Sequence, residues 1–199
     1  MNLLDYYLEE LCNLDWSHGN RPKTNHPEFW NFEPRYKESL LDLNKFKGNI
    51  FGWSDTHFYH ANVISFANRP FIDINDMHTQ MINNYNNTVS DNDVCIFVGD
   101  VSFKKAELTN LILDQLKGYK ILICGNHDFV KKGKILDMNF NEIHPIYSLD
   151  NYIFSHYPLD NVPIGHINVH GHTHNILCSG NKHLNVCVEQ INYTPILIK

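Results

Sequence analysis

The stretch Ile50-Phe51-Gly52-Trp53-Ser54-Asp55-Thr56-His57 decides the fold, because a short apolar run ends there in a polar cluster. Such a run is typical of a buried strand. The same order of apolar run and polar cluster occurs four more times along the chain. These clusters are Gly99-Asp100, Gly125-Asn126-His127-Asp128, Ser155-His156 and Gly171-His172-Thr173-His174. Since ligands of open α/β sheets bind beyond the carboxyl ends of the strands, we expect all five clusters at one edge.

Helical and strand-like segments alternate around these clusters. We expect strands over 50–53, 94–98 and 120–124, and helices over 61–67, 76–89 and 106–116. This alternation predicts an α/β sheet with helices on its faces. Strand-like runs follow at 142–147, 152–155, 167–170 and 184–188, with no helix between them. They predict a second, more antiparallel sheet.

The first 47 residues differ from the rest. Apolar spacing predicts a helix over 3–11, Asn and Pro predict a loop over 20–34, and 38–46 is expected to be a second helix. We therefore divide the chain into an N-terminal helical extension, 1–47, packed on the core, and one domain, 48–199. A length of 199 residues fits this division.

Composition excludes several classes of partner. No apolar run approaches the roughly 20 residues that span a bilayer, and the N-terminus lacks secretory-signal features, so we expect a cytoplasmic protein without a membrane partner. The formal net charge of −6 argues against a nucleic-acid polymer as the main ligand. The five cysteines form no C-x-x-C pair, which fits free thiols in a reducing compartment.

The polar clusters are rich in metal-ligand types. Asp, Asn and His without cysteine favour a divalent Mn, Fe, Zn, Co or Ni ion over a closed thiolate zinc site. In Asp55-x-His57 and His172-x-His174 two donors stand two residues apart, so in an extended segment they point the same way. Seven donors are too many for one ion and fit two ions that share a carboxylate.

The ordered set Asp-x-His, Gly-Asp, Gly-Asn-His-Asp, His and Gly-His-x-His resembles the calcineurin-like metallophosphoesterase superfamily over about residues 49–199. The segments 54–60 and 68–71 are similar to the small cap-less members from bacteria and their phages. For a phage protein this implies the host cytoplasm. The resemblance implies a four-layer α/β/β/α sandwich, here with the N-terminal extension, and two divalent metal ions, manganese first. The implied ligands are Asp55, His57 and His174 for one ion, Asp100 as the bridge, and Asn126, His156 and His172 for the other.

The resemblance also implies a reaction, the attack of metal-bridging hydroxide on the phosphorus of an ester. His127 would then protonate the leaving oxygen or stabilise the charge that develops on it, and Asp128 is expected to orient the His127 imidazole. His60 is expected either to touch the substrate or to act as a polar cap. Arg69 is expected either to grip a phosphate or to anchor the turn before Pro70.

Several functions are compatible with these residues. The first is a phosphodiesterase acting on a small nucleotide-like substrate, which the acidic charge favours over polymer cleavage. The second is a phosphomonoesterase for proteins or nucleotides, and a nuclease is a weaker third because Lys and Arg are few. A non-catalytic metal-binding scaffold would use the same fold, but all seven expected ligands and His127 are present.

Overall fold

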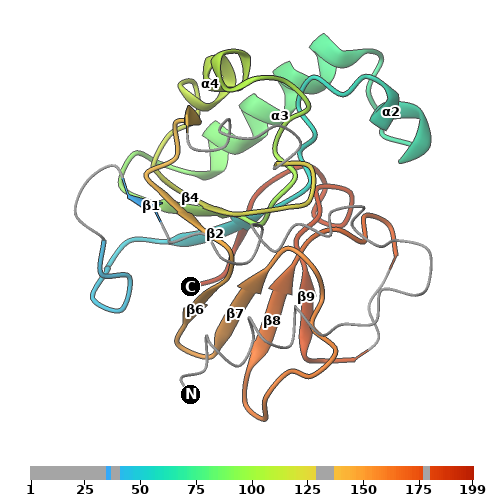
Figure 1. The fold of residues 1–199 in the computed structure, drawn as a ribbon. Helices are drawn as coiled ribbons and strands as arrows, with labels where there is room; N and C mark the ends of the chain where they lie inside the picture. Colours follow the sequence, from blue (N-terminus) through green and yellow to red (C-terminus); the bar gives the residue numbers. More distant parts are fainter. Residues whose placement is uncertain (1–34, 37–40, 129–136, 177–179) are drawn as a thin grey trace.

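The structure, a computed structural model, describes residues 35–36, 41–128, 137–176 and 180–199, and its architecture is mixed α/β (Figure 1). The helices in these ranges are α2 (Asn62–Phe66), α3 (Ile74–Thr88) and α4 (Ala106–Leu113). The strands are β1 (Arg35–Tyr36), β2 (Ile50–Trp53), β3 (Val94–Phe97), β4 (Tyr119–Ile123), β5 (Glu142–His144), β6 (Tyr147–Leu149), β7 (Tyr152–Ser155), β8 (Ile167–His170), β9 (His183–Asn185) and β10 (Ile196–Leu197). The expected helices of the domain and most of its expected strands are present.

A six-stranded sheet of order β1-β5-β4-β3-β2-β10 forms the centre of the fold. Strands β2, β3, β4 and β5 run parallel, and β1 and β10 are antiparallel edge strands. Parallel neighbours need a crossover connection, which the helices supply between β2, β3 and β4. Because these three strands are adjacent and parallel, their carboxyl ends meet at one edge.

A four-stranded sheet of order β6-β7-β8-β9 packs against the first. Here β7, β8 and β9 are parallel and β6 alone is antiparallel. The expectation of a second, more antiparallel sheet is therefore wrong. The connection 156–166 returns the chain from the end of β7 to the starting edge of the sheet before β8 begins, so these two neighbouring strands form no hairpin.

One apolar core lies between the helices and the six-stranded sheet. Met77, Met81 and Tyr85 recur on one face of α3 and are buried there. They pack in one cluster with residues of β2, β3 and β4, and the rings of Tyr85 and Trp53 lie 5.1 Å apart. Asp73 caps this helix, since its carboxylate accepts from two N–H groups of the first turn.

A second core lies between the two sheets. Val94, Ile96 and Ile121 of the first sheet pack there with Phe154 and Val169 of the second. Strands buried on both faces explain the continuous apolar runs of the sequence. All the described helices cover the six-stranded sheet, as Figure 1 shows, and within the described residues no helix covers the other one. The described layers are therefore helices, sheet and sheet.

Two sequence expectations change at the edges of these elements. The run 142–147 is divided between the sheets, because the chain leaves β5 at Pro145, which has no N–H to donate, and enters β6 at Tyr147. The described part of the expected helix 38–46 is a turn instead, since Lys45 N–H donates to Asp42 O at 3.0 Å and Asn44 N–H to Asp42 Oδ1 at 3.2 Å. The expected helix 3–11 and loop 20–34 lie outside the described residues.

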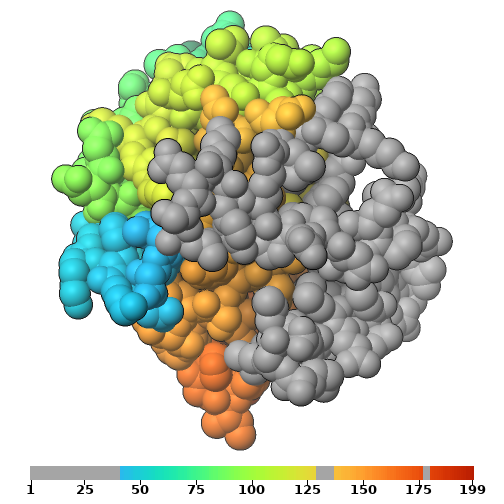
Figure 2. Space-filling view, turned by 60° about the vertical axis from the view of Figure 1, so that its left-hand side comes forward, coloured from blue at the N-terminus to red at the C-terminus, as the bar shows by residue number. Residues whose placement is uncertain are grey.

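The segment that begins at residue 41 packs on the domain. Leu43 is buried in the core between the sheets, together with Leu149 and Phe154. In Figure 2 this blue segment lies against orange residues of the second sheet. None of the described helices is both long and apolar enough to cross a membrane.

Candidate metal centre

The five polar clusters stand at the carboxyl ends of five strands. Those of Asp55, Asp100 and Asn126 follow the parallel strands β2, β3 and β4, and those of His156 and His172 follow the parallel strands β7 and β8. The two sheets are joined at this edge by a bridge between Ser54 and Cys187. The topology therefore brings distant parts of the sequence to one place.

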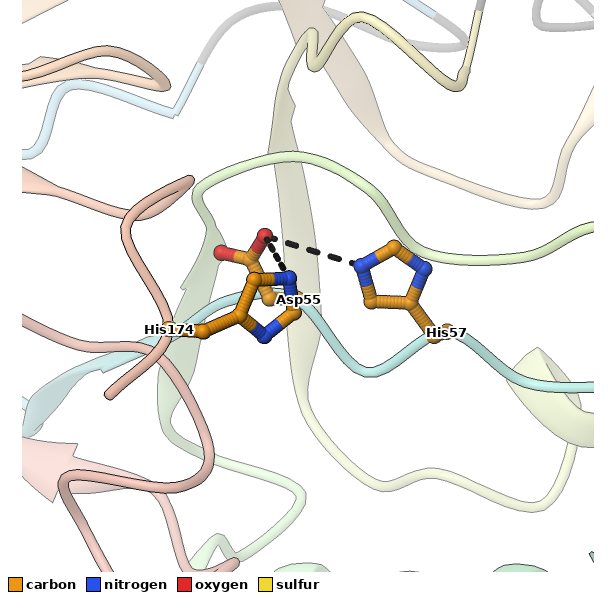
Figure 3. A group of neighbouring side chains, drawn as sticks. All are labelled: Asp55, His57 and His174. Atoms are coloured by element: carbon orange, nitrogen blue, oxygen red, sulfur yellow. Dashed lines mark ion pairs between the residues drawn. The ribbon is translucent and has the colours of Figure 1, made fainter. Parts of the chain in front are cut away.

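Asp55, His57 and His174 form the first ligand group, and one donor atom of each lies within 4.8 Å of the others. Asp55 Oδ1 is 3.7 Å from Nε2 of His57 and 3.7 Å from Nε2 of His174. Figure 3 shows both imidazoles turned toward this carboxylate from different loops. Three donors that converge on one point can hold a divalent ion.

Asp100, His156 and His172 form the second ligand group, with the same spacing of donor atoms. Asn126 belongs to it, because its Oδ1 lies 3.0 Å from Nε2 of His156. All seven ligands expected from the sequence are thus assigned to two neighbouring groups.

Asp100 stands between the two groups. Its Oδ2 is 3.4 Å from Nε2 of His156 in the second group and 3.9 Å from Nε2 of His57 in the first. The other oxygen of this carboxylate accepts from the backbone N–H of His127 at 2.8 Å, which fixes its orientation. One carboxylate within reach of both groups is the arrangement that a bridging ligand needs.

Buried polar atoms in the first group have no hydrogen-bond partner among the described residues. These atoms are Asp55 Oδ1 and both ring nitrogens of His57. A buried polar atom without a partner is costly unless something else satisfies it, and a bound cation would satisfy these. The donor set therefore fits metal ions.

The charges of the site point the same way. Burial would raise the pKa of Asp100, but the neighbouring His156 lowers it to about 2. Burial would lower the pKa of His156, but the carboxylates of Asp100 and Asp55 raise it to about 10. His172 is different, since its burial lowers its pKa to about 4. Two ionised carboxylates in a buried, histidine-rich site attract positive charge, which the protonated His156 supplies here and a bound cation would supply once His156 releases its proton and ligates. The neutral His172 is ready to ligate.

Five of the ligands have left-handed backbone conformations. Their φ angles are 57° at Asp55, 50° at His57, 55° at Asp100, 67° at His172 and 46° at His174. Such conformations are unfavourable for residues with a Cβ, by about 1–3 kcal/mol each. Strain of this kind gathers at functional sites and is held there by the surrounding structure.

Two glycines allow the loops of the site to approach closely. A Cβ on Gly171 would collide with the side chains of Ser54 and Asp55, and one on Gly125 would collide with Asp100. Glycine is therefore needed before both of these ligand clusters, because loops from different strands pack too closely there for a Cβ.

Hydrogen bonds orient two of the ligating histidines. His156 Nδ1 lies 2.8 Å from the carbonyl oxygen of Val98, and His174 Nδ1 lies 2.9 Å from Oε1 of Glu189. Each bond directs Nε2 toward the centre of the site, which is how outer partners fix the tautomer of ligating histidines. The sequence interpretation missed Glu189, although it stands directly after the apolar run 184–188, as the other clusters follow theirs.

Arg69 lies beneath the first ligand group, and its side chain is fully buried. Its guanidinium donates to the carbonyl oxygens of Asp55 at 2.7 Å and Thr56 at 2.9 Å, and to Glu189 Oε1 at 2.7 Å. These bonds use the planar fork within the protein. Arg69 therefore holds the backbone of the first ligand loop, which differs from both expected roles, the phosphate contact and the anchor of the turn before Pro70.

His127 and Asp128 do not form the pair expected from the sequence. His127 Nε2 lies 3.9 Å from Asp100 Oδ2, and its side chain is 39% exposed. The Asp128 carboxylate instead accepts from the backbone N–H groups of Gly125, Asp100 and Val101 at 2.8–2.9 Å. Asp128 therefore ties the loop after β3 to the loop after β4, and its expected contact with the His127 ring is replaced by these bonds.

His60 lies at the rim of the site. Its ring stacks on Phe103 at a centroid distance of 3.9 Å and lies 5.7 Å from the ring of His57. Burial lowers the pKa of His60 to about 4, so its imidazole is neutral at pH 7.

No protein-family model matches the chain. Over 153 residues, 72% of this chain and 83% of the other, it is 38% identical to an uncharacterized protein of Methanocaldococcus jannaschii. The crystal structure of a protein of unknown function from Aquifex aeolicus is also similar, with a TM-score of 0.61 and 26% identity, over 76% of this chain and 96% of that one.

Proposed function

The chain belongs to the same family as the uncharacterized protein of Methanocaldococcus jannaschii, and we propose that it is a dinuclear metal-dependent phosphoesterase. The proposal includes the four-layer sandwich of the metallophosphoesterases, and the helices, sheet and sheet of the described residues are compatible with it. A single observation carries it, namely two adjacent ligand groups with Asp100 within reach of both.

The residues of the two groups would hold two ions, with manganese first among the candidates. Two bound ions lower the pKa of water toward about 7 and neutralise charge on a phosphoryl group. Both groups consist of oxygen and imidazole donors and contain no cysteine, which fits this chemistry.

His127 would act on the leaving oxygen. Its Nε2 is the ring atom near Asp100, and the partly exposed ring can meet a substrate from outside. Burial lowers its pKa, so at pH 7 the neutral imidazole would donate a hydrogen bond that stabilises developing charge. Of the two roles expected for His127, this favours charge stabilisation over full proton transfer.

We favour small phosphodiesters as substrates. The acidic net charge disfavours long polyanions. A monoester carries one more negative charge than a diester, and the Arg69 guanidinium, which could balance that charge, is already bound by Glu189 and two carbonyl groups. Phosphomonoesters are the alternative substrate class.

The test is hydrolysis of bis(p-nitrophenyl) phosphate and of p-nitrophenyl phosphate by manganese-loaded protein. The wild type is compared with Asp100→Ala and with Asp91→Ala, a change at an exposed carboxylate away from the site. We expect diester cleavage that Asp100→Ala abolishes and Asp91→Ala retains. Preferred cleavage of the monoester would support the alternative class, and no cleavage of either ester would contradict the proposed activity.

A further inference from the structure

Two exposed phenylalanine rings stand beside the first ligand group. Phe66 is the last residue of α2 and is 60% exposed, and Phe103 lies in the loop after β3 and is 39% exposed. The rings come from different elements, a helix and a loop, yet both contact the imidazole of His60, at centroid distances of 5.5 Å and 3.9 Å. They form an aromatic rim, defined here as Phe66, Phe103 and His60.

This rim is in direct contact with the candidate metal centre. The Phe103 ring lies 5.2 Å from the ring of His57 and 4.7 Å from that of His127. The Phe66 ring meets His174 edge-on at 6.1 Å. Both phenylalanine rings therefore contact residues that are proposed to bind a metal ion or to act on the leaving oxygen.

Packing alone does not account for the rim. Single exposed apolar residues are common on protein surfaces, and Ile72 and Ile164 are examples on this chain. Phe66 and Phe103 differ because they share one polar partner and stand beside buried carboxylates and imidazoles. Apolar walls around a few fixed polar groups are typical of small-molecule sites.

We propose that Phe66, Phe103 and His60 form a subsite for a planar aromatic ring of the substrate, the base of a small nucleotide ester whose phosphate lies at the two ligand groups. This inference rests on the proposed phosphoesterase function and names its substrate class. Any nucleobase can stack on an aromatic side chain, because every base has a π-face. One stacked base contributes about 5- to 150-fold in affinity. The closeness of the rim to His57 and His174 suits a ring that is joined to the phosphate by one sugar.

Two esters with the same leaving group test the subsite. Thymidine 5′-(p-nitrophenyl phosphate) and methyl p-nitrophenyl phosphate release the same p-nitrophenolate, so they differ only in the alcohol that is retained. We expect a KM about 5- to 150-fold lower for the thymidine ester. Phe66→Ala and Phe103→Ala should each reduce this KM ratio, and Ile72→Ala, at an exposed apolar residue elsewhere, should leave it unchanged. Phe103→Leu keeps an apolar side chain of similar size and serves as the second variant should Phe103→Ala fail to fold.

The outcomes separate the subsite from the activity. If both esters are cleaved with equal KM, or if the ratio survives both phenylalanine changes, the subsite is overturned while the phosphoesterase function stands. If neither ester is cleaved, the proposed activity fails. Calorimetry then compares the affinities of thymidine 5′-phosphate and of methyl phosphate for the manganese-loaded protein. Tighter binding of the nucleotide by the wild type, with this advantage lost in the phenylalanine variants, supports the subsite. Equal binding of the two phosphates overturns the subsite.

Discussion

Glu189 Oε1 lies 2.9 Å from Nδ1 of His174 and 2.7 Å from the guanidinium of Arg69, so one buried carboxylate connects the first ligand group to its support. Burial would raise the pKa of Glu189, but His174 and Arg69 lower it, and the side chain stays ionised. An ionised partner at Nδ1 raises the basicity of the ligating nitrogen. Glu189 is therefore a positioning residue for the metal centre.

Glu189→Gln keeps the size of this side chain and removes its charge. We expect about 10- to 100-fold weaker manganese binding at the first ligand group, since outer partners of ligating histidines contribute on that scale. Titration of metal-free protein against a competing chelator measures the effect. The control is Glu142→Gln, which alters a buried carboxylate 2.8 Å from His144, outside both ligand groups. Equal affinities in the two variants would contradict the role of Glu189.

Gly171→Ala places a methyl group against Ser54 and Asp55. We expect lower stability, by about 1–3 kcal/mol for an overpacked buried position, together with weaker metal binding. Gly165→Ala is the comparison, because no atom lies within 4 Å of the Cβ added there, so any loss comes from its positive φ of 84°, which Gly171 lacks. Urea denaturation should show the larger loss for Gly171→Ala. The steric account fails if only Gly165→Ala destabilises the protein.

His127→Ala removes the ring that would stabilise the leaving oxygen. Both metal ions should be retained, because His127 is in neither ligand group. Turnover of a diester with a poor leaving group should fall by roughly 10²- to 10⁴-fold, the usual range for a positioned acid or donor. Metal content and kcat are measured beside His166→Ala, a histidine on the exposed loop before β8. Loss of both ions from the His127 variant would contradict this assignment.

Three buried thiols give a prediction for the pH dependence of stability. Burial raises the pKa of Cys95, Cys124 and Cys187 above the ordinary value. The unfolded chain ionises its thiols near pH 8.5, while the folded chain keeps these protons. Their contribution to stability is therefore complete below about pH 8.5 and is lost as the pH rises above it.

Alkylation by iodoacetamide at pH 9 checks this difference. Peptide mass spectrometry should find Cys95, Cys124 and Cys187 unmodified in the folded protein and fully modified in urea. The outcome at Cys187 is the most informative, because its sulfur lies 3.3 Å from Asp55 Oδ2. Rapid modification of Cys187 in the folded protein would mean that the candidate site is open to solvent at its base.

The candidate ligands could be predicted from the sequence because each follows an apolar strand. Asp55, Asp100 and Asn126 share one edge simply because β2, β3 and β4 are parallel neighbours, and their regular alternation with helices indicates that arrangement. The second sheet lacked such a signal. The long connections before β8 and β9 carry no helical pattern, so the parallel direction of these strands could not be inferred from periodicity.

The support of the site could not be predicted for a different reason. Arg69 and Glu189 are 120 positions apart, and their contact depends on how both loops pack beneath Asp55. Asp128 stands beside His127 in the sequence, yet its carboxylate turns to the backbone of another loop. Residue type and spacing identify which groups can ligate a metal, whereas tertiary packing decides which groups hold them in place.

The most direct test is a crystal structure of manganese-soaked protein, with anomalous scattering recorded at the manganese edge. The account predicts two anomalous peaks about 3.5–4 Å apart, the usual separation of two-metal sites, with Asp100 bound to both. The first peak should be ligated by Asp55, His57 and His174, and the second by Asn126, His156 and His172. A single peak, or peaks away from these side chains, would contradict the dinuclear centre on which the proposed function depends.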